Sequence, residues 1–174
     1  PFKRLRVVTM KRIMIIGSPG SGKTTLAQAL GKKLKLPLVH LDHLYWLPGR
    51  IRRPKEEFHE LMMQACKQDA WVMDGNSISM LAERIPFADT IIFLDIPRKT
   101  CMSRIIKRAW KSLFKREEFA PGCRVTIRLE FLNWAWRWEA KYRDEAMRII
   151  ATAPLAKTIL LQSPKAVTEF LSTL

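Results

Sequence analysis

Residues 17–24 read Gly-Ser-Pro-Gly-Ser-Gly-Lys-Thr and fit the pattern GxxxxGK[ST] at every fixed position. The pattern is typical of a loop that wraps the phosphates of a nucleotide, because its glycines let backbone N–H groups turn towards the anion and the next helix presents its positive end. We expect Lys23 to contact the β- and γ-phosphates and Thr24 to bind Mg²⁺, with ATP as the nucleotide. The predicted nucleotide-binding residues are Gly17, Ser18, Pro19, Gly20, Ser21, Gly22, Lys23, Thr24 and Thr25.

Two aspartates, Asp42 and Asp74, follow other strand-like segments. Ligands of an open parallel sheet bind at the carboxyl ends of its strands, so both carboxylates are expected near the phosphate loop. There Asp42 is suited to orient or deprotonate an acceptor hydroxyl. The alternatives are a solvated acid for Asp42 and a turn-forming Asp-Gly pair for Asp74.

Basic and aromatic side chains supply further candidates for the site. Arg104 and Arg108 are four residues apart on a predicted helix and project to one side, where they would neutralise a phosphoryl group in transfer. The alternative is a basic, solvated helix face. A basic loop at 112–124 is a candidate lid. The predicted substrate-binding residues are Asp42, Tyr45, Trp46, Arg84 and Arg116, although plain burial would equally suit the two aromatic residues.

Other chemistry-bearing residues are interpreted as packing. His40 and His43 have no further histidine or cysteine cluster beside them, so we favour a core or cleft position over a metal site. Trp134 and Trp138 are four residues apart on a predicted helix, a spacing that favours core packing. The three cysteines, Cys66, Cys101 and Cys123, lack metal-binding or disulfide spacing and are interpreted as buried thiols of a reduced, cytoplasmic protein.

The 174 residues carry a formal net charge of +15, which predicts attraction to nucleotides, nucleic acid or another acidic surface. No uncharged apolar stretch is long enough to span a bilayer, and we expect no membrane association. Met10 directly precedes the first strand-like run. Residues 1–9 are therefore interpreted as an extension outside the fold or as an artefact of start-site choice.

The elements that hold these residues alternate between strand and helix. That alternation favours a single domain, residues 1–174, built on a parallel sheet with right-handed crossovers. Apolar runs predict strands at 12–17, 37–41, 71–73, 90–94 and 158–161. Helical spacing and end signals predict helices at 22–35, 54–69, 77–84, 98–111 and 125–151, and a last one capped by Ser163 with Pro164 in its first turn.

Several short motifs beyond the phosphate loop carry a resemblance to a known family. The chain resembles the adenylate-kinase-like superfamily of P-loop nucleoside and nucleotide kinases, and within it the group called DNA topology modulation proteins. It departs from that group at Asp144, where a proline is expected after Arg143. The motifs are HLDHLYW at 40–46 with Pro48, WVMDGN at 71–76, Arg84 with Ala88 and Asp89, Gly122-Cys123, and EFLNWAW at 130–136.

The resemblance implies a three-layer α/β fold with a five-stranded parallel sheet in the order 2-3-1-4-5 and a small basic lid. It also implies that Asp74 holds Mg²⁺ through water, and that Arg104 and Arg108 lead into the lid. The expected activity is transfer of the γ-phosphate of ATP to a nucleoside, a nucleotide or a small alcohol. GTPases are disfavoured because no guanine-binding NKxD-type motif occurs. The rival interpretations are an ATP-regulated nucleic-acid-binding protein affecting DNA topology and an ATPase without an acceptor.

Overall fold

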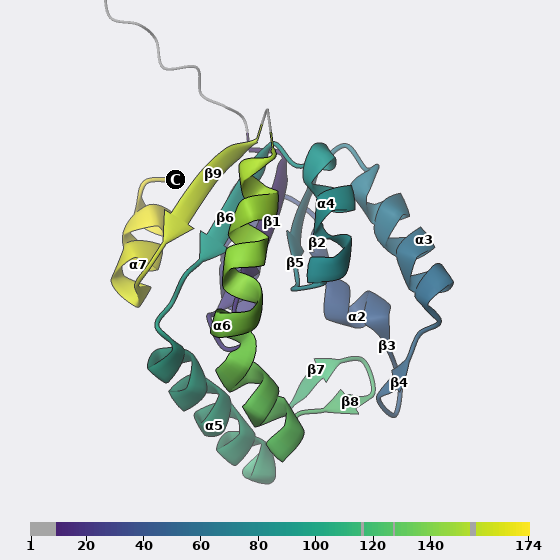
Figure 1. Ribbon diagram of the computed structural model, residues 1–174, viewed down its shortest axis with the longest axis vertical. Helices are drawn as coiled ribbons and strands as arrows, with labels where there is room; N and C mark the ends of the chain where they lie inside the picture. The colour runs from purple at the N-terminus through teal and green to yellow at the C-terminus, as the bar shows by residue number, and fades with distance from the viewer. Residues whose placement is uncertain (1–9, 116, 127, 154–155) are drawn as a thin grey trace, which may run out of the picture.

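The computed structural model describes residues 10–115, 117–126, 128–153 and 156–174. Its centre is a parallel five-stranded sheet in the order β2-β5-β1-β6-β9 (Figure 1). In chain order these are the second, third, first, fourth and fifth sheet strands, so the predicted order is confirmed. The strands are β1 (Arg12–Gly17), β2 (Leu38–His40), β5 (Trp71–Asp74), β6 (Thr90–Leu94) and β9 (Lys157–Leu161).

The central strands form where the sequence is continuously apolar, because helices cover both faces of the sheet. All five residues of β6 are buried, and so are residues 13–17 of β1. The register places Ile15 opposite Asp74 and Gly17 opposite Leu94. The strand ends that carry polar residues therefore meet at one edge of the sheet.

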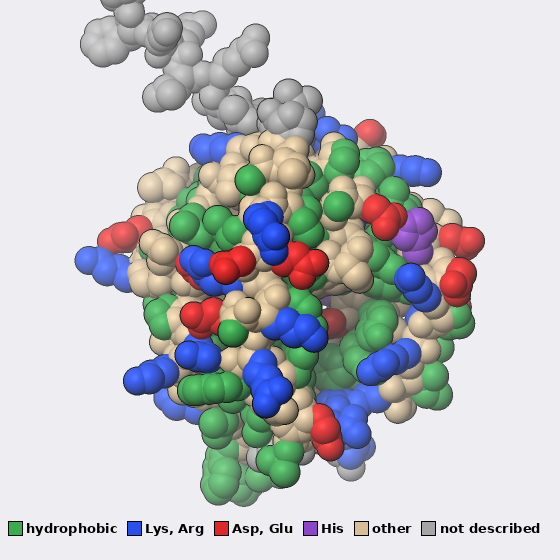
Figure 2. Space-filling view, in the orientation of Figure 1, with side chains coloured by type: hydrophobic (Ala, Val, Ile, Leu, Met, Phe, Trp, Pro, Cys, Tyr) green, Lys and Arg blue, Asp and Glu red, His purple; other side chains and the backbone are tan. Residues whose placement is uncertain are grey.

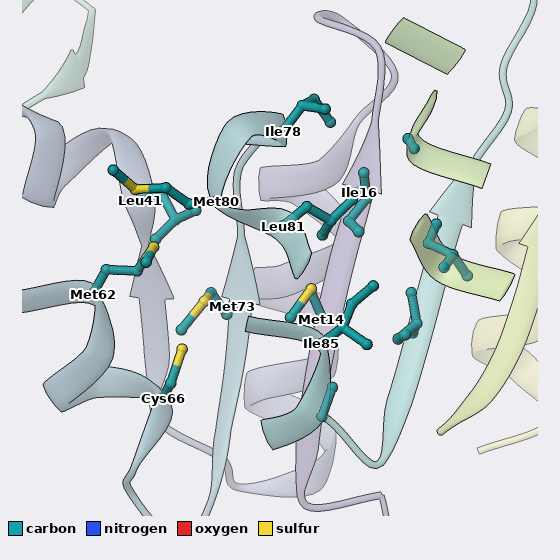
Figure 3. Packing of buried hydrophobic residues seen from close by; sticks show 14 of the residues in the cluster. Met14, Ile16, Leu41, Met62, Cys66, Met73, Ile78, Met80, Leu81 and Ile85 are labelled. Carbon is teal, nitrogen blue, oxygen red and sulfur yellow. The ribbon is translucent and has the colours of Figure 1, made fainter. Parts of the chain in front are cut away.

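Helices cover the two faces of the sheet and give three layers (Figure 1). On one face, α3, α4 and α6 pack over Met14, Met73 and their neighbours (Figure 3). On the other face, α1 and α7 pack over Ile13 and Ile15. The helices are α1 (Lys23–Leu34), α2 (Leu41–Tyr45), α3 (Lys55–Cys66), α4 (Leu81–Arg84), α5 (Arg98–Phe114), α6 (Leu129–Ala151) and α7 (Pro164–Ser172), with 3₁₀ turns η1 (Ile78–Met80) and η2 (Ile85–Phe87).

Two smaller predictions, one about a helix cap and one about the cysteines, are confirmed. The Ser163 hydroxyl accepts a hydrogen bond from the Ala166 N–H at 3.1 Å and so caps α7. The thiols of Cys66, Cys101 and Cys123 are all buried and free.

The predicted helix at 125–151 starts too early, because α6 begins at Leu129. The Val125 N–H instead donates to the Glu117 carbonyl at 2.8 Å, next to a hairpin of β7 (Glu118–Ala120) and β8 (Cys123–Arg124). The region 112–124 is thus not simply a loop: its start continues α5, and its end forms this hairpin. Arg116 lies outside the described residues.

A second short hairpin was not predicted. After the single-turn helix α2, strands β3 (Trp46–Leu47) and β4 (Ile51–Arg52) pair antiparallel. The turn between them contains Gly49 and Arg50, both with positive φ. We call residues 41–53, which comprise α2 and this hairpin, the acceptor-side segment.

Core packing was the wrong prediction for Trp134. Trp138 is buried with 2% of its surface exposed, but Trp134 is 40% exposed. The reason is that the N-terminal half of α6 extends past the sheet and runs beside α5 (Figure 1). None of the helices in the described ranges is both long enough and apolar enough to cross a bilayer.

Candidate active site

The phosphate loop connects β1 to α1 and packs directly against α5. Gly20 has φ +77°, and a Cβ there would lie 2.5 Å from the Cys101 carbonyl oxygen. Gly22 has φ +101° at the N-terminus of α1. Both positions therefore require glycine, and the loop has no room to move towards α5.

The polar groups of this loop fit a phosphate ligand. The Ser21 hydroxyl is buried and has no hydrogen-bond partner. The Lys23 ammonium donates to the carbonyl oxygens of Gly17 and Ser18, both at 2.9 Å. Burial lowers the pKa of Lys23, while the charges of Asp74 and Asp42 act in the opposite direction. A phosphate bound here would supply the anionic partner that this lysine and this hydroxyl lack.

A chain of short hydrogen bonds joins α1, β5 and β2. The Thr24 hydroxyl donates to Asp74 Oδ2 at 2.6 Å, and His40 Nδ1 donates to Asp74 Oδ1 at 2.5 Å. Burial alone would raise the pKa of Asp74, but the hydrogen bonds from His40 and Thr24 outweigh it and lower this pKa. The bond to Asp74 correspondingly raises the pKa of His40. Asp74 is thus held as a carboxylate next to the phosphate loop.

Asp42 lies in the first turn of α2, on the acceptor-side segment. Its side chain is reached by solvent, yet desolvation by the surrounding protein raises its pKa, against the opposing charge of Lys23. Figure 2 shows an opening in the face of the molecule in this region, with an acidic side chain at its bottom. The rings of His43 and His40 lie close together but tilted by 52°, with centroids 4.8 Å apart, and burial lowers the pKa of His43.

The hairpin β7–β8 closes against the acceptor-side segment. The Gly49 N–H donates to the Gly122 carbonyl at 3.1 Å, and the Cys123 thiol donates to the Leu47 carbonyl at 3.2 Å. The rings of Trp46 and Phe119 meet edge to face at 6.1 Å. The candidate lid and the acceptor-side segment are therefore in direct contact.

Tyr45 and Trp46 are half-buried and pack edge to face on each other, with ring centroids 4.9 Å apart. Tyr45 also contacts Phe58 of α3 at 5.2 Å in the same geometry. These contacts give both rings a packing role at the junction of the acceptor-side segment and α3.

The structure separates the two arginines of α5. Arg104 reaches the phosphate loop, where it donates to the Ser21 carbonyl at 2.9 Å. Arg108 has a side chain that is 50% exposed, and its Nε lies 3.4 Å from Glu117 Oε2, next to the candidate lid. Arg104 is therefore brought to the nucleotide site, and Arg108 is held at its margin.

Arg84 is not brought to the cleft surface. It is completely buried, donates to the Ser77 carbonyl at 3.1 Å and leaves its Nε without a partner. Burial lowers the pKa of its guanidinium to about 10. In this arrangement Arg84 supports the backbone just after β5.

Sequence reasoning missed two polar contacts at this edge of the sheet. Asn76 Oδ1 accepts a hydrogen bond from the Gly17 N–H at 3.4 Å and so links the turn after β5 to the phosphate loop. Asp95 accepts two hydrogen bonds from Arg143, both at 2.8 Å. The position of Asp95 after a strand was a signal, but its partner lies 48 residues away and no local pattern identifies it.

Comparison with known proteins places this geometry in context. A protein-family model described as an AAA domain matches residues 13–120. The uncharacterized protein YqaC of Bacillus subtilis is 28% identical over 127 residues, which cover 72% of this chain and 71% of that protein. A cytidylate kinase of Pyrobaculum aerophilum is 30% identical over 116 residues, covering 58% of this chain and 62% of that enzyme's own length.

Among solved structures, a shikimate kinase from Acinetobacter baumannii in complex with shikimate superposes with a TM-score of 0.63. The match covers 95% of this chain and 90% of that one at 17% sequence identity. At this identity the likeness establishes the fold, which is that of the P-loop kinases.

Proposed function

The chain belongs to the AAA domain family, and we propose that it is an ATP-dependent phosphotransferase that moves the γ-phosphate of ATP to a small acceptor. The observation that carries this proposal is the convergence of Lys23, Thr24, Asp74 and Asp42 at the carboxyl edge of one parallel sheet. A phosphate loop alone is common to many nucleotide-binding proteins. Transfer to an acceptor also needs a group that orients or deprotonates the acceptor, and Asp42 on the acceptor-side segment can serve as that group.

Each residue of the site has a distinct proposed role. Residues 17–25 bind the phosphates, and Thr24 with Asp74 would hold Mg²⁺, which neutralises phosphate charge when it is bound. Mg²⁺ is commonly held by one or two protein oxygens together with substrate phosphates, so a hydroxyl and one carboxylate suit it. Asp42 acts on the acceptor, with Tyr45 and Trp46 as walls of its pocket. Arg84 holds the backbone at Ser77, and it would reach an acceptor only if that turn moved.

We further propose that the region 112–124 acts as a lid and that Arg104 and Arg108 stabilise the transferring phosphoryl group, with Arg116 as a third contributor. The contact of Arg104 with Ser21 supports this for one of them. The contact of the β7–β8 hairpin with the acceptor-side segment would help to exclude water, and this favours transfer over hydrolysis. The buried free thiols are consistent with a reducing compartment, and we propose the cytoplasm.

Replacement of the loop lysine tests the proposal. Lys23→Ala removes the cation that contacts the loop carbonyls, so Mg·ATP should no longer raise the melting temperature and ADP formation should stop. Lys67→Ala is the matched control, because Lys67 is exposed and precedes the amino end of β5. Equal stabilisation of all three proteins by Mg·ATP would contradict the assignment.

The net charge of +15 favours a second candidate, a nucleic-acid-binding protein regulated by ATP. The resemblance to the DNA topology modulation group points the same way. Binding of a polyanion by charge alone should be weak and independent of base sequence, whereas a DNA-binding function requires coupling to Mg·ATP. We favour the phosphotransferase because the convergent carboxylates serve chemistry that DNA binding does not need.

A further inference from the structure

We propose that the end of α5 and the start of α6 form a docking surface for a membrane that contains anionic phospholipid. The proposal goes beyond the phosphotransferase and does not depend on it. Figure 2 shows hydrophobic side chains gathered at the bottom of the molecule, over the end of α5 in Figure 1. We call this surface the apolar tip, and its large apolar residues, each between 52% and 82% exposed, are Ile106, Trp110, Leu113, Phe114 and Leu129.

The helix α5 presents apolar side chains to the protein and also to solvent. Cys101 and Ala109 are buried against the rest of the protein. Ile106, Trp110 and Phe114 follow one another at intervals of four residues and form a second row, which is exposed. The rings of Trp110 and Phe114 lie 6.3 Å apart. A surface helix normally carries polar residues on its solvent side, so an exposed apolar row of this size indicates a docking site.

The charge on α5 is entirely positive. Residues 98–115 contain seven lysines and arginines and no aspartate or glutamate. Lys107 and Lys111 are exposed and four residues apart, so they form a row beside that of Ile106 and Trp110. A row of cations next to a row of apolar side chains complements a lipid surface, because acyl chains accept the apolar groups and anionic headgroups attract the lysines.

Other occupants fit the apolar tip less well. A second copy of the chain in a twofold contact would bring the same face against itself, and Lys107 and Lys111 of the two copies would meet. Nucleic acid would meet the cations, but its bases stack on rings and gain little from Ile106, Leu113 and Leu129. Acyl chains accept aliphatic and aromatic side chains alike. The composition of the tip therefore favours an anionic membrane.

The sequence-based expectation of no membrane association rested on the length of apolar stretches. Spanning a bilayer requires such a stretch, whereas contact with its surface requires only one apolar face flanked by cations. The acidic residues nearest to α5 along the chain are Glu117, Glu118 and Glu130, and all lie outside that helix. Glu117 is occupied by Arg108 at 3.4 Å. The row of lysines on α5 is thus uninterrupted by acidic groups.

Sedimentation with lipid vesicles tests the proposal. The full chain is mixed at physiological salt with vesicles of phosphatidylserine and phosphatidylcholine in equal parts, or with vesicles of phosphatidylcholine alone. Two pairs of substitutions at exposed positions separate apolar contact from charge. Ile106→Ser with Trp110→Ser removes apolar side chains, and Lys107→Glu with Lys111→Glu reverses two charges.

The matched control for charge is Lys67→Glu with Lys157→Glu. Both lysines are exposed, and they lie at the amino ends of β5 and β9, at the opposite end of the sheet from α5 (Figure 1). The net charge changes as much as in the α5 pair. Charges more than about 8 Å from the lipid are largely screened at physiological salt, so the control should weaken binding less than about fivefold.

We expect the wild-type protein to bind the mixed vesicles and to bind phosphatidylcholine alone only weakly. The serine pair should weaken binding by about 10–100-fold, because two apolar side chains no longer leave water. The glutamate pair should weaken it by at least about 25-fold, since each lysine near an anionic surface contributes about fivefold. Melting temperatures close to that of the wild type would show that these variants fold.

Quenching of tryptophan fluorescence by brominated acyl chains provides a second readout. Trp110→Phe keeps an apolar ring at this position, so this variant should bind as the wild type does and lose part of the quenching. Binding with unchanged quenching would show that Trp110 stays outside the lipid and would overturn the proposal.

Other results would contradict the proposal in different ways. Equal weakening by the two charge-reversed pairs would indicate attraction by overall charge, and full binding by the serine pair would exclude the apolar row. Without vesicle binding, single-stranded DNA that is bound at physiological salt and lost in the serine pair would assign the tip to nucleic acid. A wild-type dimer that the serine pair dissociates, again without vesicle binding, would assign it to a second copy of the chain.

Discussion

Replacement of Gly20 by alanine tests the packing of the phosphate loop against α5. Two glycines in the chain have nearly the same φ, Gly20 with +77° and Gly49 with +78°. They differ in surroundings. A Cβ at Gly20 would lie 2.5 Å from the Cys101 carbonyl oxygen and 2.9 Å from Ile105 Cγ1, whereas a Cβ at Gly49 would meet nothing within 4 Å. Gly49→Ala is therefore a control for the backbone effect alone.

The expected magnitudes follow from these distances. A left-handed conformation costs a residue with a Cβ roughly 1–2 kcal/mol. The reduced freedom of the unfolded chain offsets roughly 0.4–1 kcal/mol of that. Gly49→Ala should therefore destabilise by about 1 kcal/mol. At Gly20 the clash is with helix backbone, which cannot rotate away, and overpacking adds about 1–3 kcal/mol, for a total of about 2–4 kcal/mol.

Melting temperature and nucleotide binding together provide the assay. For a chain of this size 1 kcal/mol corresponds to roughly 2–4 °C, so Gly49→Ala should lower Tm by about 2–4 °C and Gly20→Ala by about 5–15 °C. Gly20→Ala should also weaken Mg·ATP binding, because relief of the clash displaces α5 and with it the contact of Arg104 with Ser21. If the two variants had the same melting temperature and bound Mg·ATP equally well, the close approach of the loop to α5 would be refuted.

The remaining predictions concern the groups around the phosphates. His40→Leu removes the donor to Asp74 and should raise the Mg²⁺ concentration for half-maximal turnover by about 10–100-fold. His40→Asn keeps a donor near the Nδ1 position and should return this concentration most of the way to the wild-type value. Equal effects of the two substitutions would assign His40 to packing alone. Arg104→Ala should lower kcat by about 10²–10³-fold. The affinity of the Arg104→Ala variant for DNA should stay weak, sensitive to salt and unaffected by Mg·ATP. Tight, salt-resistant DNA binding coupled to Mg·ATP would favour the nucleic-acid alternative instead.

The sheet could be predicted from the sequence because its strands are buried on both faces. Runs such as residues 13–16 and 91–94 are apolar without interruption, and their burial follows from that pattern alone. The two hairpins have strands of two or three residues, and contacts between segments far apart in the chain stabilise them. Val125 shows the effect, since its predicted helical N–H is bound to Glu117 instead.

In the candidate site, too, local features could be predicted from the sequence and contacts between distant residues could not. The phosphate loop is local, so eight consecutive residues identified it. The role of His40 was missed because its partner, Asp74, lies 34 residues away, and a lone histidine more often packs than donates to a carboxylate. Arg84 was predicted to bind the substrate, but a short helix between two 3₁₀ turns buries it. Trp134 was misjudged because spacing indicates a helix face and not where the sheet beneath it ends.

Strand order explains why these distant residues meet. β1 lies between β5 and β6, so the phosphate loop that follows β1 has Asp74 on one side and Asp95 on the other. β2 lies beyond β5. Its last residue, His40, contacts Asp74, and Asp42 follows in the first turn of α2. A different order of the same strands would keep every motif of the sequence and separate the carboxylates from the loop. The proposed chemistry therefore depends on topology as much as on the residues, and the β2–β5 pairing at His40 and Asp74 is the contact on which the acceptor side rests.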